Sequence, residues 1–347
     1  MEDLLYRWVA LGGFFVISFI AWVTGSNDPI NKKTIGGSIL IAWTIGGLTF
    51  WFPWTRNTLD WINDALIAIL HASQKGSIFL FGPLAVGPGQ TLPDGTPSVG
   101  FVLAMQVLPS VIFFSALISV LYYLKIMQAC VNVFARLFHK SMALSGAESL
   151  SASANIFVGI ESCLTIRPYL DRMSRSELLT LMTCMMATVA STVMAVYIIA
   201  LENVFPQIAG HLVSASIISI PCAVLVSKLS LPEIEIPQTL GSIPKEIPQN
   251  GPSESQLGEN LKKQSNLMIA LIEGGTQGVK LAIGIATLLI VVLGLEGVVD
   301  LFLKYLPNVA EEPITMTRIL GWVTWPFTIL VGLRPEEWKL GSQILGS

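Results

Sequence analysis

The fold is decided by the stretch from Ala143 to Met173, which reads ALSGAESLSASANIFVGIESCLTIRPYLDRM. Its first limb, residues 143–154, is rich in Ala, Ser and Gly, and its second limb, residues 162–170, contains Pro168. Neither limb approaches the length of about 20 residues that a membrane-spanning helix needs. Small residues allow short limbs to pack closely against neighbouring helices. The stretch therefore predicts a helical hairpin, the first hairpin, that returns to the side from which it enters.

The composition of the whole chain places this hairpin in a membrane. Of the 347 residues, 52% are hydrophobic and only 12% are charged, and the net charge is −3. Soluble domains carry roughly 25% charged residues. A soluble enzyme and a disordered chain are therefore excluded, and so is a nucleic-acid partner, which would require a basic excess. We expect an all-α, multi-pass integral membrane protein surrounded by membrane lipid.

Apolar runs of about 20 residues mark the expected spans. A helical apolar pattern interrupted by Asp60 and Asp64 favours an amphipathic helix on the membrane surface at residues 56–73. Residues 76–100 are expected to be mostly loop, because Gly and Pro recur there. The expected spans are 4–24, 35–54, 107–127, 176–200, 205–229 and 279–303, and a last apolar run covers 314–333.

A proline-rich, polar segment at about residues 231–265 predicts a solvated linker between two halves. If the amino terminus lies outside, most Lys and Arg residues fall in internal segments, with Lys228 counted in the internal loop that includes the linker. This assignment of sides requires that the first hairpin enters and leaves the membrane on the same side. The expected divisions are scaffold spans with the interfacial helix (4–75), the third span, first hairpin and following span (101–200), and a carboxyl-terminal domain (201–347).

Two carboxylates of the first hairpin are candidates for function. Glu161 lies at the expected tip, and a carboxylate at membrane depth is a binding-site candidate because its insertion is costly. The alternative is that Glu161 caps its own limb or pairs with Arg167. Glu148 follows Ser145 at the third position, which favours a capping box at the start of the first limb.

Oxygen-bearing side chains near the tip are candidates for a hard cation. Asn155 precedes the tip, and Thr188, Ser191 and Thr192 cluster in an otherwise apolar span. Amide, hydroxyl and backbone carbonyl oxygens suit a cation such as sodium. The alternative is that these hydroxyls bond to carbonyls of their own helix, as is common in membrane spans.

Enzyme chemistry finds little support in the sequence. The three histidines, His71, His139 and His211, are far apart and lack metal-ligand spacing. The pair Gly274-Gly275 is interpreted as a turn and not as a phosphate-binding loop. Cysteines 130, 163, 184 and 222 are interpreted as packing residues, with no disulfide, metal site or cofactor. We therefore expect no enzyme.

Five segments in a fixed order carry a longer pattern. They are Leu108–Leu124, Ala147-Glu148-Ser149 with Ala154–Gly159, Ile166–Tyr169, Ser174–Leu178 and Leu231-Pro232-Glu233. From about residue 10 to the carboxyl end, the chain thus resembles the concentrative nucleoside transporter family. The resemblance implies a secondary active transporter that imports nucleosides by symport with sodium, or alternatively with protons.

The resemblance also implies an architecture and a location. It implies a homotrimer in the plasma membrane, which is the inner membrane in a Gram-negative bacterium. Each protomer would combine a scaffold domain with a transport domain that moves like an elevator and carries two opposed re-entrant hairpins. The first hairpin of this chain matches the first of these, and residues 319–332 resemble one limb of the second hairpin.

Site residues follow from the resemblance by position. Gly159, Ile160 and Glu161 match the hairpin tip that contacts the nucleobase. The sodium site of sodium-coupled members matches Asn155 and the carbonyl of Val158, together with Thr188 and the carbonyl of Val189.

The sequence departs from the family pattern at two places. The tip reads Gly159-Ile160-Glu161, one residue shorter than the Gly-Gln-Thr-Glu of many members, which leaves base specificity open. The family's Asn-Glu-Phe motif and its last two spans are absent after residue 347. We therefore expect a truncated chain that has one half of the binding site and is inactive or incomplete. The alternative functions are a non-transporting membrane scaffold or oligomerisation fragment, and a channel.

Overall fold

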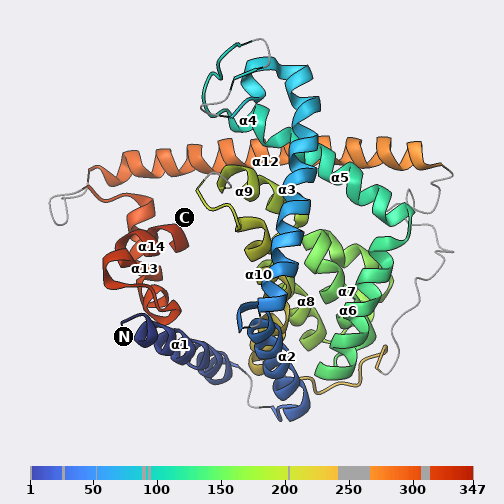
Figure 1. Cartoon of the computed structure of the whole chain (residues 1–347). Helices are drawn as coiled ribbons and strands as arrows, with labels where there is room; N and C mark the ends of the chain where they lie inside the picture. Colours follow the sequence, from blue (N-terminus) through green and yellow to red (C-terminus); the bar gives the residue numbers. More distant parts are fainter. Residues whose placement is uncertain are drawn as a thin grey trace. The chain divides into compact units, whose positions relative to one another are not determined.

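The computed structural model describes residues 2–25, 28–51, 53–87, 91–92, 95–201, 204–240, 266–305 and 313–346. Figure 1 shows that these segments are almost entirely helical. Within the described ranges no strand forms, and a single bridge pairs Thr91 with Pro97. The predicted all-α fold class is confirmed.

The helices fall into two compact units, which are described separately. The larger unit covers Ser26–Ile283, and the smaller unit joins Met1–Gly25 with Gly284–Ser347. The long helix α12 (Leu267–Leu303) contributes residues to both. The larger unit also contains α2 (Lys32–Trp51), α3 (Pro53–Phe81), η1 (Gly82–Ala85), α4 (Leu103–Gln106), α5 (Leu108–Tyr123), α6 (Ile126–Met142), α7 (Gly146–Val158), η2 (Gly159–Arg172), α8 (Arg175–Ala187), α9 (Ser191–Leu201) and α10 (Ile208–Ser230).

Five helical segments of the described residues are long and apolar enough to cross a membrane. They are Tyr6–Thr24, Asn63–Ala85, Leu103–Tyr123, Ile208–Ser230 and Leu267–Leu303. The helix α12 alone has 37 residues. At a rise of about 1.5 Å per residue it is about 55 Å long, more than the hydrocarbon core of a bilayer. These lengths place the chain in a membrane.

Several predicted boundaries were wrong. The amphipathic helix expected at 56–73 and the start of the expected loop at 76–100 form one continuous helix, α3. The expected turn at Gly274-Gly275 lies inside α12. Helix α6 was not predicted at all, because the polar residues that share its outer face with apolar ones lower the mean hydropathy of the segment. The expected span at 176–200 is interrupted, since α8 ends at Ala187 and α9 begins at Ser191.

The first part of the expected linker, residues 231–240, is partly docked on the protein and not fully solvated. Backbone amides of Gly146 and Ala147, at the start of α7, donate to the carbonyl and the hydroxyl of Thr239 at 3.0 Å each. Pro232, Pro237 and Thr239 are buried. The rest of the expected linker, residues 241–265, lies outside the described residues.

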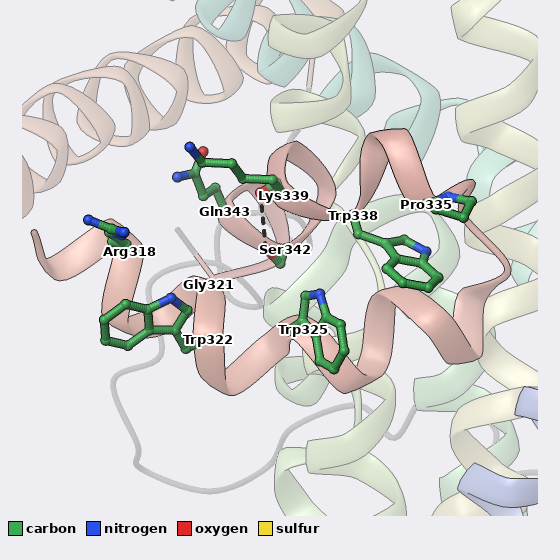
Figure 2. A pocket seen from close by; sticks show the side chains of 9 residues that line it. All are labelled: Arg318, Gly321, Trp322, Trp325, Pro335, Trp338, Lys339, Ser342 and Gln343. Carbon is green, nitrogen blue, oxygen red and sulfur yellow. Dashed lines mark hydrogen bonds between the residues drawn. The ribbon is translucent and has the colours of Figure 1, made fainter. Parts of the chain in front are cut away.

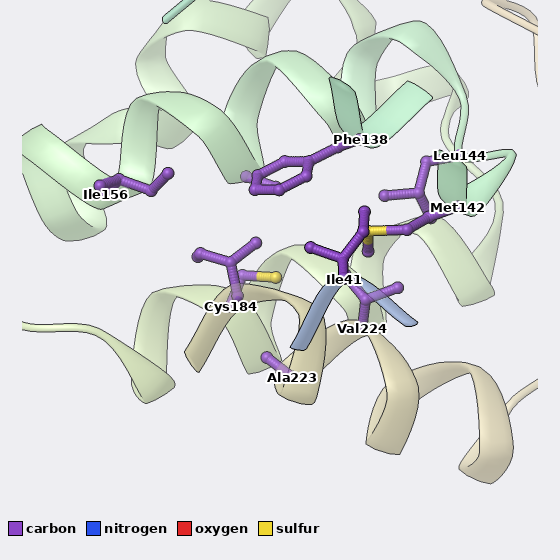
Figure 3. Packing of buried hydrophobic residues seen from close by; sticks show 10 residues of the cluster. Ile41, Phe138, Met142, Leu144, Ile156, Cys184, Ala223 and Val224 are labelled. Atoms are coloured by element: carbon purple, nitrogen blue, oxygen red, sulfur yellow. The ribbon is translucent and has the colours of Figure 1, made fainter. Parts of the chain in front are cut away.

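The core of the larger unit gathers around α6, α7, α8 and α10. Figure 3 shows Phe138 and Met142 of α6 facing Ile156 of α7, Cys184 of α8 and Val224 of α10. All five side chains are almost fully buried. A second cluster joins the apolar face of α6 to the first hairpin through Met127, Val131, Ala135, Ala147, Leu150 and Ile166. In a membrane such clusters act mainly through close van der Waals packing, which here joins the hairpin to α6, α8 and α10.

The smaller unit contains a helical hairpin that the sequence did not predict in full. The smaller unit consists of α1 (Glu2–Thr24), the end of α12, α13 (Met316–Val331), η3 (Pro335–Glu337) and α14 (Trp338–Gly346), and the hairpin is formed by α13 and α14. Gly332, at a φ of 84°, ends α13 and turns the chain. Helix α14 then packs back on α13, where Thr324 donates a 2.6 Å hydrogen bond to the Ser342 carbonyl. The expectation of a single limb at 319–332 was therefore wrong.

Candidate functional site

The first limb of the first hairpin is the helix α7. Ser145 accepts from the Glu148 backbone amide and Glu148 accepts from the Ser145 amide, so the predicted capping box is confirmed. Two of the helix's unpaired amides are satisfied in this way. Small residues line the interior of the limb, and Ser149, Ser153, Ala154 and Asn155 are fully buried.

Gly159 reverses the chain at the end of α7. It adopts φ 70° and ψ −140°, a conformation that only glycine reaches without strain. The returning limb is the 3-10 helix η2, Gly159–Arg172, which packs on α7. The backbone thus forms two limbs, α7 and η2, on either side of Gly159. The re-entry of this hairpin into one side of a membrane stays a prediction.

The tip of this hairpin lies against the interruption between α8 and α9. A Cβ atom added to Gly159 would lie 2.6 Å from the Ala190 Cβ, closer than two such atoms can approach. Thr188 at this interruption is extended, with φ −121° and ψ 154°. Two irregular segments of backbone therefore meet here, with Val158 and Val189 next to the contact.

Asn155 joins the hairpin to this interruption. Its Nδ2 donates to the Cys184 carbonyl at 2.6 Å and to the Thr188 hydroxyl at 2.5 Å. Its Oδ1 accepts a longer bond of 3.4 Å from Ser162 in the returning limb. The Asn155 side chain is fully buried, so it connects both limbs and α8 where water has no access.

The sequence left two alternatives for the neighbouring hydroxyls, a cation site and bonds within their own helix, and the structure shows a different arrangement for each described hydroxyl. Thr188 donates to the Cys184 carbonyl of its own helix at 3.2 Å, as the bonding alternative predicted. Ser191 instead donates to the Phe157 carbonyl in the hairpin. The structure thus brings Asn155 and Thr188 into contact, and places a cluster of amide, hydroxyl and carbonyl oxygens at the hairpin tip.

Parts of the predicted site lie outside the described side chains. The backbone of Ile160 and Glu161 follows Gly159 in η2. Their side chains, and those of Val158, Thr192 and Arg167, are not among those described. The base-contacting role of Glu161 and its alternative pairing with Arg167 therefore stay predictions.

A buried ion cluster supports the base of the hairpin. Lys228 approaches Glu148 at 2.6 Å and Glu233 at 3.3 Å, and donates to the Ser176 hydroxyl at 2.9 Å. Lys228 is only 6% exposed and lies in the last turn of α10, so its assignment to an internal loop was wrong. Sequence reasoning missed the cluster because the partners of Lys228 lie 5 to 80 residues from it, and only the spacing from Lys228 to Glu233 gave a local signal.

The smaller unit has a cavity between α13 and α14. Figure 2 shows the three tryptophans that line it, Trp322 and Trp325 of α13 and Trp338 at the start of α14. The Arg318 guanidinium lies 5.5 Å from the centre of the Trp322 ring. The volume of the cavity is about 380 Å³. None of the predicted site residues lines it, and it is therefore not the predicted nucleoside site.

Comparison with known families covers almost the entire chain. Residues 12–84 match the model of the Na+-dependent nucleoside transporter amino terminus, and residues 211–347 match that of its carboxyl terminus. Between them, residues 104–203 match the Gate model, described as nucleoside recognition. This middle region contains the first hairpin and the interruption between α8 and α9.

Individual relatives and solved structures agree with the family models. Nucleoside permease NupC of Helicobacter pylori is 32% identical over 96% of this chain and 75% of its own length. Sodium/nucleoside cotransporter 2 of Rattus norvegicus is 30% identical over 92% of this chain and 44% of its own length. The structure of CNTnw in an inward-facing substrate-bound state matches with a TM-score of 0.82 and 30% identity, over 100% of this chain and 77% of that one. The chain therefore belongs to the concentrative, Na+-dependent nucleoside transporter family.

Proposed function

We propose that this protein imports nucleosides across the plasma membrane by symport with sodium, using the first hairpin and the α8–α9 interruption as its ion and base site. The observation that carries the proposal is the contact between two irregular backbone segments, Gly159 against Ala190, which Asn155 joins to Thr188. Irregular backbone inside a membrane is tolerated where it lines a binding site.

The proposed sodium ligands are Asn155, Thr188 and the carbonyls of Val158 and Val189. In the structure the Asn155 Nδ2 donates to the Thr188 hydroxyl at 2.5 Å, and the two valines flank the Gly159–Ala190 contact. To bind the ion, the Asn155 amide would turn so that its Oδ1 takes the place of Nδ2 beside the Thr188 hydroxyl. Such oxygens suit a hard monovalent cation. An ion bound by both segments would fix the tip relative to α8 and order the backbone that carries Gly159, Ile160 and Glu161, which we assign to the nucleobase.

The coupling energy is sufficient for accumulation. One sodium ion moving inward through 100 mV releases about 2.3 kcal/mol. Because about 1.4 kcal/mol corresponds to a factor of ten, one ion supports about 50-fold accumulation of an uncharged nucleoside. A proton moving down the same potential would provide the same energy, so the choice of ion rests on the oxygen ligands and on the family.

We also propose the assembly that the family resemblance implies. The protomer would belong to a homotrimer, in which a fixed scaffold supports a transport domain that carries the first hairpin. The tight packing of that hairpin on α6, α8 and α10 is consistent with movement as one body.

The proposal is tested by reconstituting the full chain into liposomes. Uptake of labelled uridine and adenosine is measured with a sodium gradient, with a pH gradient, and with neither. The proposal expects accumulation with the sodium gradient. Accumulation by residues 1–347 would contradict the sequence-based expectation of an inactive or incomplete chain. The Glu161→Gln variant is expected to lose about tenfold or more of this uptake, because a hydrogen bond to a charged group contributes about 1.5–3 kcal/mol. The matched control is Glu235→Gln, at an exposed position of the segment after α10.

Four results would contradict parts of the proposal. Normal uptake by Glu161→Gln would contradict the assignment of Glu161 at the hairpin tip to the nucleobase contact. Uptake that follows a pH gradient and does not depend on sodium would show that the coupling ion is the proton and not sodium. Flux without accumulation would indicate a channel, and a chain that neither binds nor transports nucleosides would favour the scaffold alternative.

A further inference from the structure

A basic pocket lies where the start of α2 meets the end of α6, away from the first hairpin's tip. Its volume is about 580 Å³. The two helices pack closely beside it, since a Cβ atom on Gly37 of α2 would collide with the Ser141 carbonyl at the end of α6. The lining residues are Lys33, Arg136, His139, Lys140, Ala143, Leu144 and Leu240.

The charges of this pocket are of one sign. Four of the seven lining side chains are basic types, and none is acidic. Lys33, Arg136 and Lys140 are exposed, and no ion pair links them to a carboxylate among the described residues. The amide groups at the start of α2 add positive potential, and no acidic residue in its first turn offsets it. The pocket therefore attracts an anion.

Part of this charge has an ordinary structural explanation. His139 and Lys140 lie in the last turn of α6, where a cation interacts favourably with the helix dipole. His139 Nδ1 donates to the Leu144 carbonyl at 2.7 Å, which leaves its Nε2 for another partner. Lys33 has no such explanation, because a cation in the first turn of α2 opposes the dipole of that helix. A bound anion would remove this repulsion.

Exposed apolar side chains adjoin the basic ones on the same helix faces. Leu40 follows Lys33 by two turns on α2 and is 61% exposed. On α6, Val133 precedes Arg136 by three residues and Leu137 precedes Lys140 by three, with exposures of 64% and 42%. The opposite face of α6 is buried in the protein. A ligand matching this surface has an anionic head and an apolar body.

We propose that this pocket binds the phosphate headgroup of an anionic phospholipid in the cytoplasmic leaflet. The headgroup would contact Lys33, Arg136 and Lys140, and one acyl chain would cover Leu40, Val133 and Leu137. Basic pockets between helices on the cytoplasmic side of membrane proteins are suited to such headgroups. A free phosphate ion shares the head chemistry but leaves the apolar side chains uncovered.

Native mass spectrometry of the full chain in detergent tests the proposal. The protein is titrated with phosphatidylglycerol and with phosphatidylcholine that carries the same acyl chains, and with inorganic phosphate as competitor. The pocket variant combines Lys33→Gln with Lys140→Gln. The control variant combines Lys75→Gln with Lys304→Gln, two exposed lysines outside the pocket that give the same change in net charge.

We expect phosphatidylglycerol to bind the unmodified chain and the control more tightly than phosphatidylcholine does. Two lost cations should weaken its binding to the pocket variant about 30-fold, at about a factor of five each. Equal binding to pocket and control variants, or no preference over phosphatidylcholine, would overturn the proposal. So would complete displacement by millimolar inorganic phosphate. If the double variant does not elute as folded protein, Arg136→Gln alone replaces it and must show a loss of about fivefold.

Discussion

At the scale of single residues, Gly159 controls the geometry of the candidate site. Its backbone angles exclude a side chain, and its Cα faces Ala190 at the interruption between α8 and α9. The residue sits between the proposed sodium ligands and the proposed base contacts. Any side chain here has to move the tip away from α8, so the position couples hairpin geometry to binding.

We predict that Gly159→Ala destabilises the protein and abolishes sodium-stimulated uptake. The strained backbone alone costs about 1–3 kcal/mol, and the collision with Ala190 adds to it. Thermal unfolding in detergent and uptake in liposomes measure the two effects. Gly284→Ala is the control, because a Cβ there meets nothing within 4 Å in α12. Unchanged uptake by Gly159→Ala would contradict the assignment of the tip.

Lys228 is the second decisive residue, because it neutralises Glu148 in a buried environment. We predict that Lys228→Met lowers stability by about 3–5 kcal/mol, since it leaves an uncompensated buried carboxylate. Adding Glu148→Gln to this variant should restore most of the loss. Thermal unfolding of both single variants and of the double variant measures the interaction. Additive losses would show that the 2.6 Å ion pair contributes nothing.

At the scale of elements, three of the four pairs of adjacent glycines in the described helices mark helix crossings, whereas both members of Gly46-Gly47 face open space. In each of three pairs, one glycine meets a neighbouring backbone closely and the other faces open space. Gly274 of α12 lies against Ser119 and Ala116 of α5, whereas Gly275 has no neighbour within 4 Å. The other two pairs are Gly12-Gly13 in α1 and Gly36-Gly37 in α2.

We predict opposite effects of the same substitution within one pair. Gly274→Ala should cost about 1–3 kcal/mol, because its Cβ would lie 2.6 Å from the Ser119 Cβ. Gly275→Ala should be neutral or stabilise the helix by about 0.5–1 kcal/mol. The unfolding temperatures of the two variants, measured in detergent, test whether their effects on stability are opposite. A loss of equal size in both would contradict the packing of α12 on α5.

The elements also show what sequence could and could not predict. Long apolar runs predicted α1, α5 and α10 with small errors at the ends, because a span needs only length and hydropathy. Hydropathy averaged over 176–200 concealed the interruption at Thr188, where only the hydroxyl cluster gave a signal. Of the hairpin in the smaller unit, the sequence predicted the limb α13 but not α14, because α14 carries Lys339 and Gln343 and does not resemble a span.

The candidate site was predictable to a similar extent. The contact of Asn155 with Thr188 followed from the family resemblance, because no local pattern links residues 33 positions apart. Glu148 and Ser145 were predictable from the capping-box spacing alone. The pairing of Glu148 with Lys228 was not predictable, since it depends on how α7 packs beside α10.

At the scale of the whole molecule, the chain is a membrane protein of the nucleoside transporter family for which we propose one specific ion site. The fold and the family rest on the helical structure and on matches along the chain. The coupling ion rests on the chemistry of Asn155 and Thr188. The central claim is therefore that sodium binds where the first hairpin meets the interruption between α8 and α9.

The sodium dependence of labelled uridine binding tests this claim most directly. The comparison uses the unmodified chain, Thr188→Val and Thr183→Val. Thr183 is the control because, among the described residues, its hydroxyl bonds only to the Leu179 carbonyl of its own helix. Loss of one ion-binding hydroxyl should raise the sodium concentration for half-maximal binding about tenfold in Thr188→Val, which corresponds to about 1.4 kcal/mol. Thr183→Val should match the unmodified chain. Sodium-independent binding, or an identical sodium dependence in all three proteins, would contradict the account.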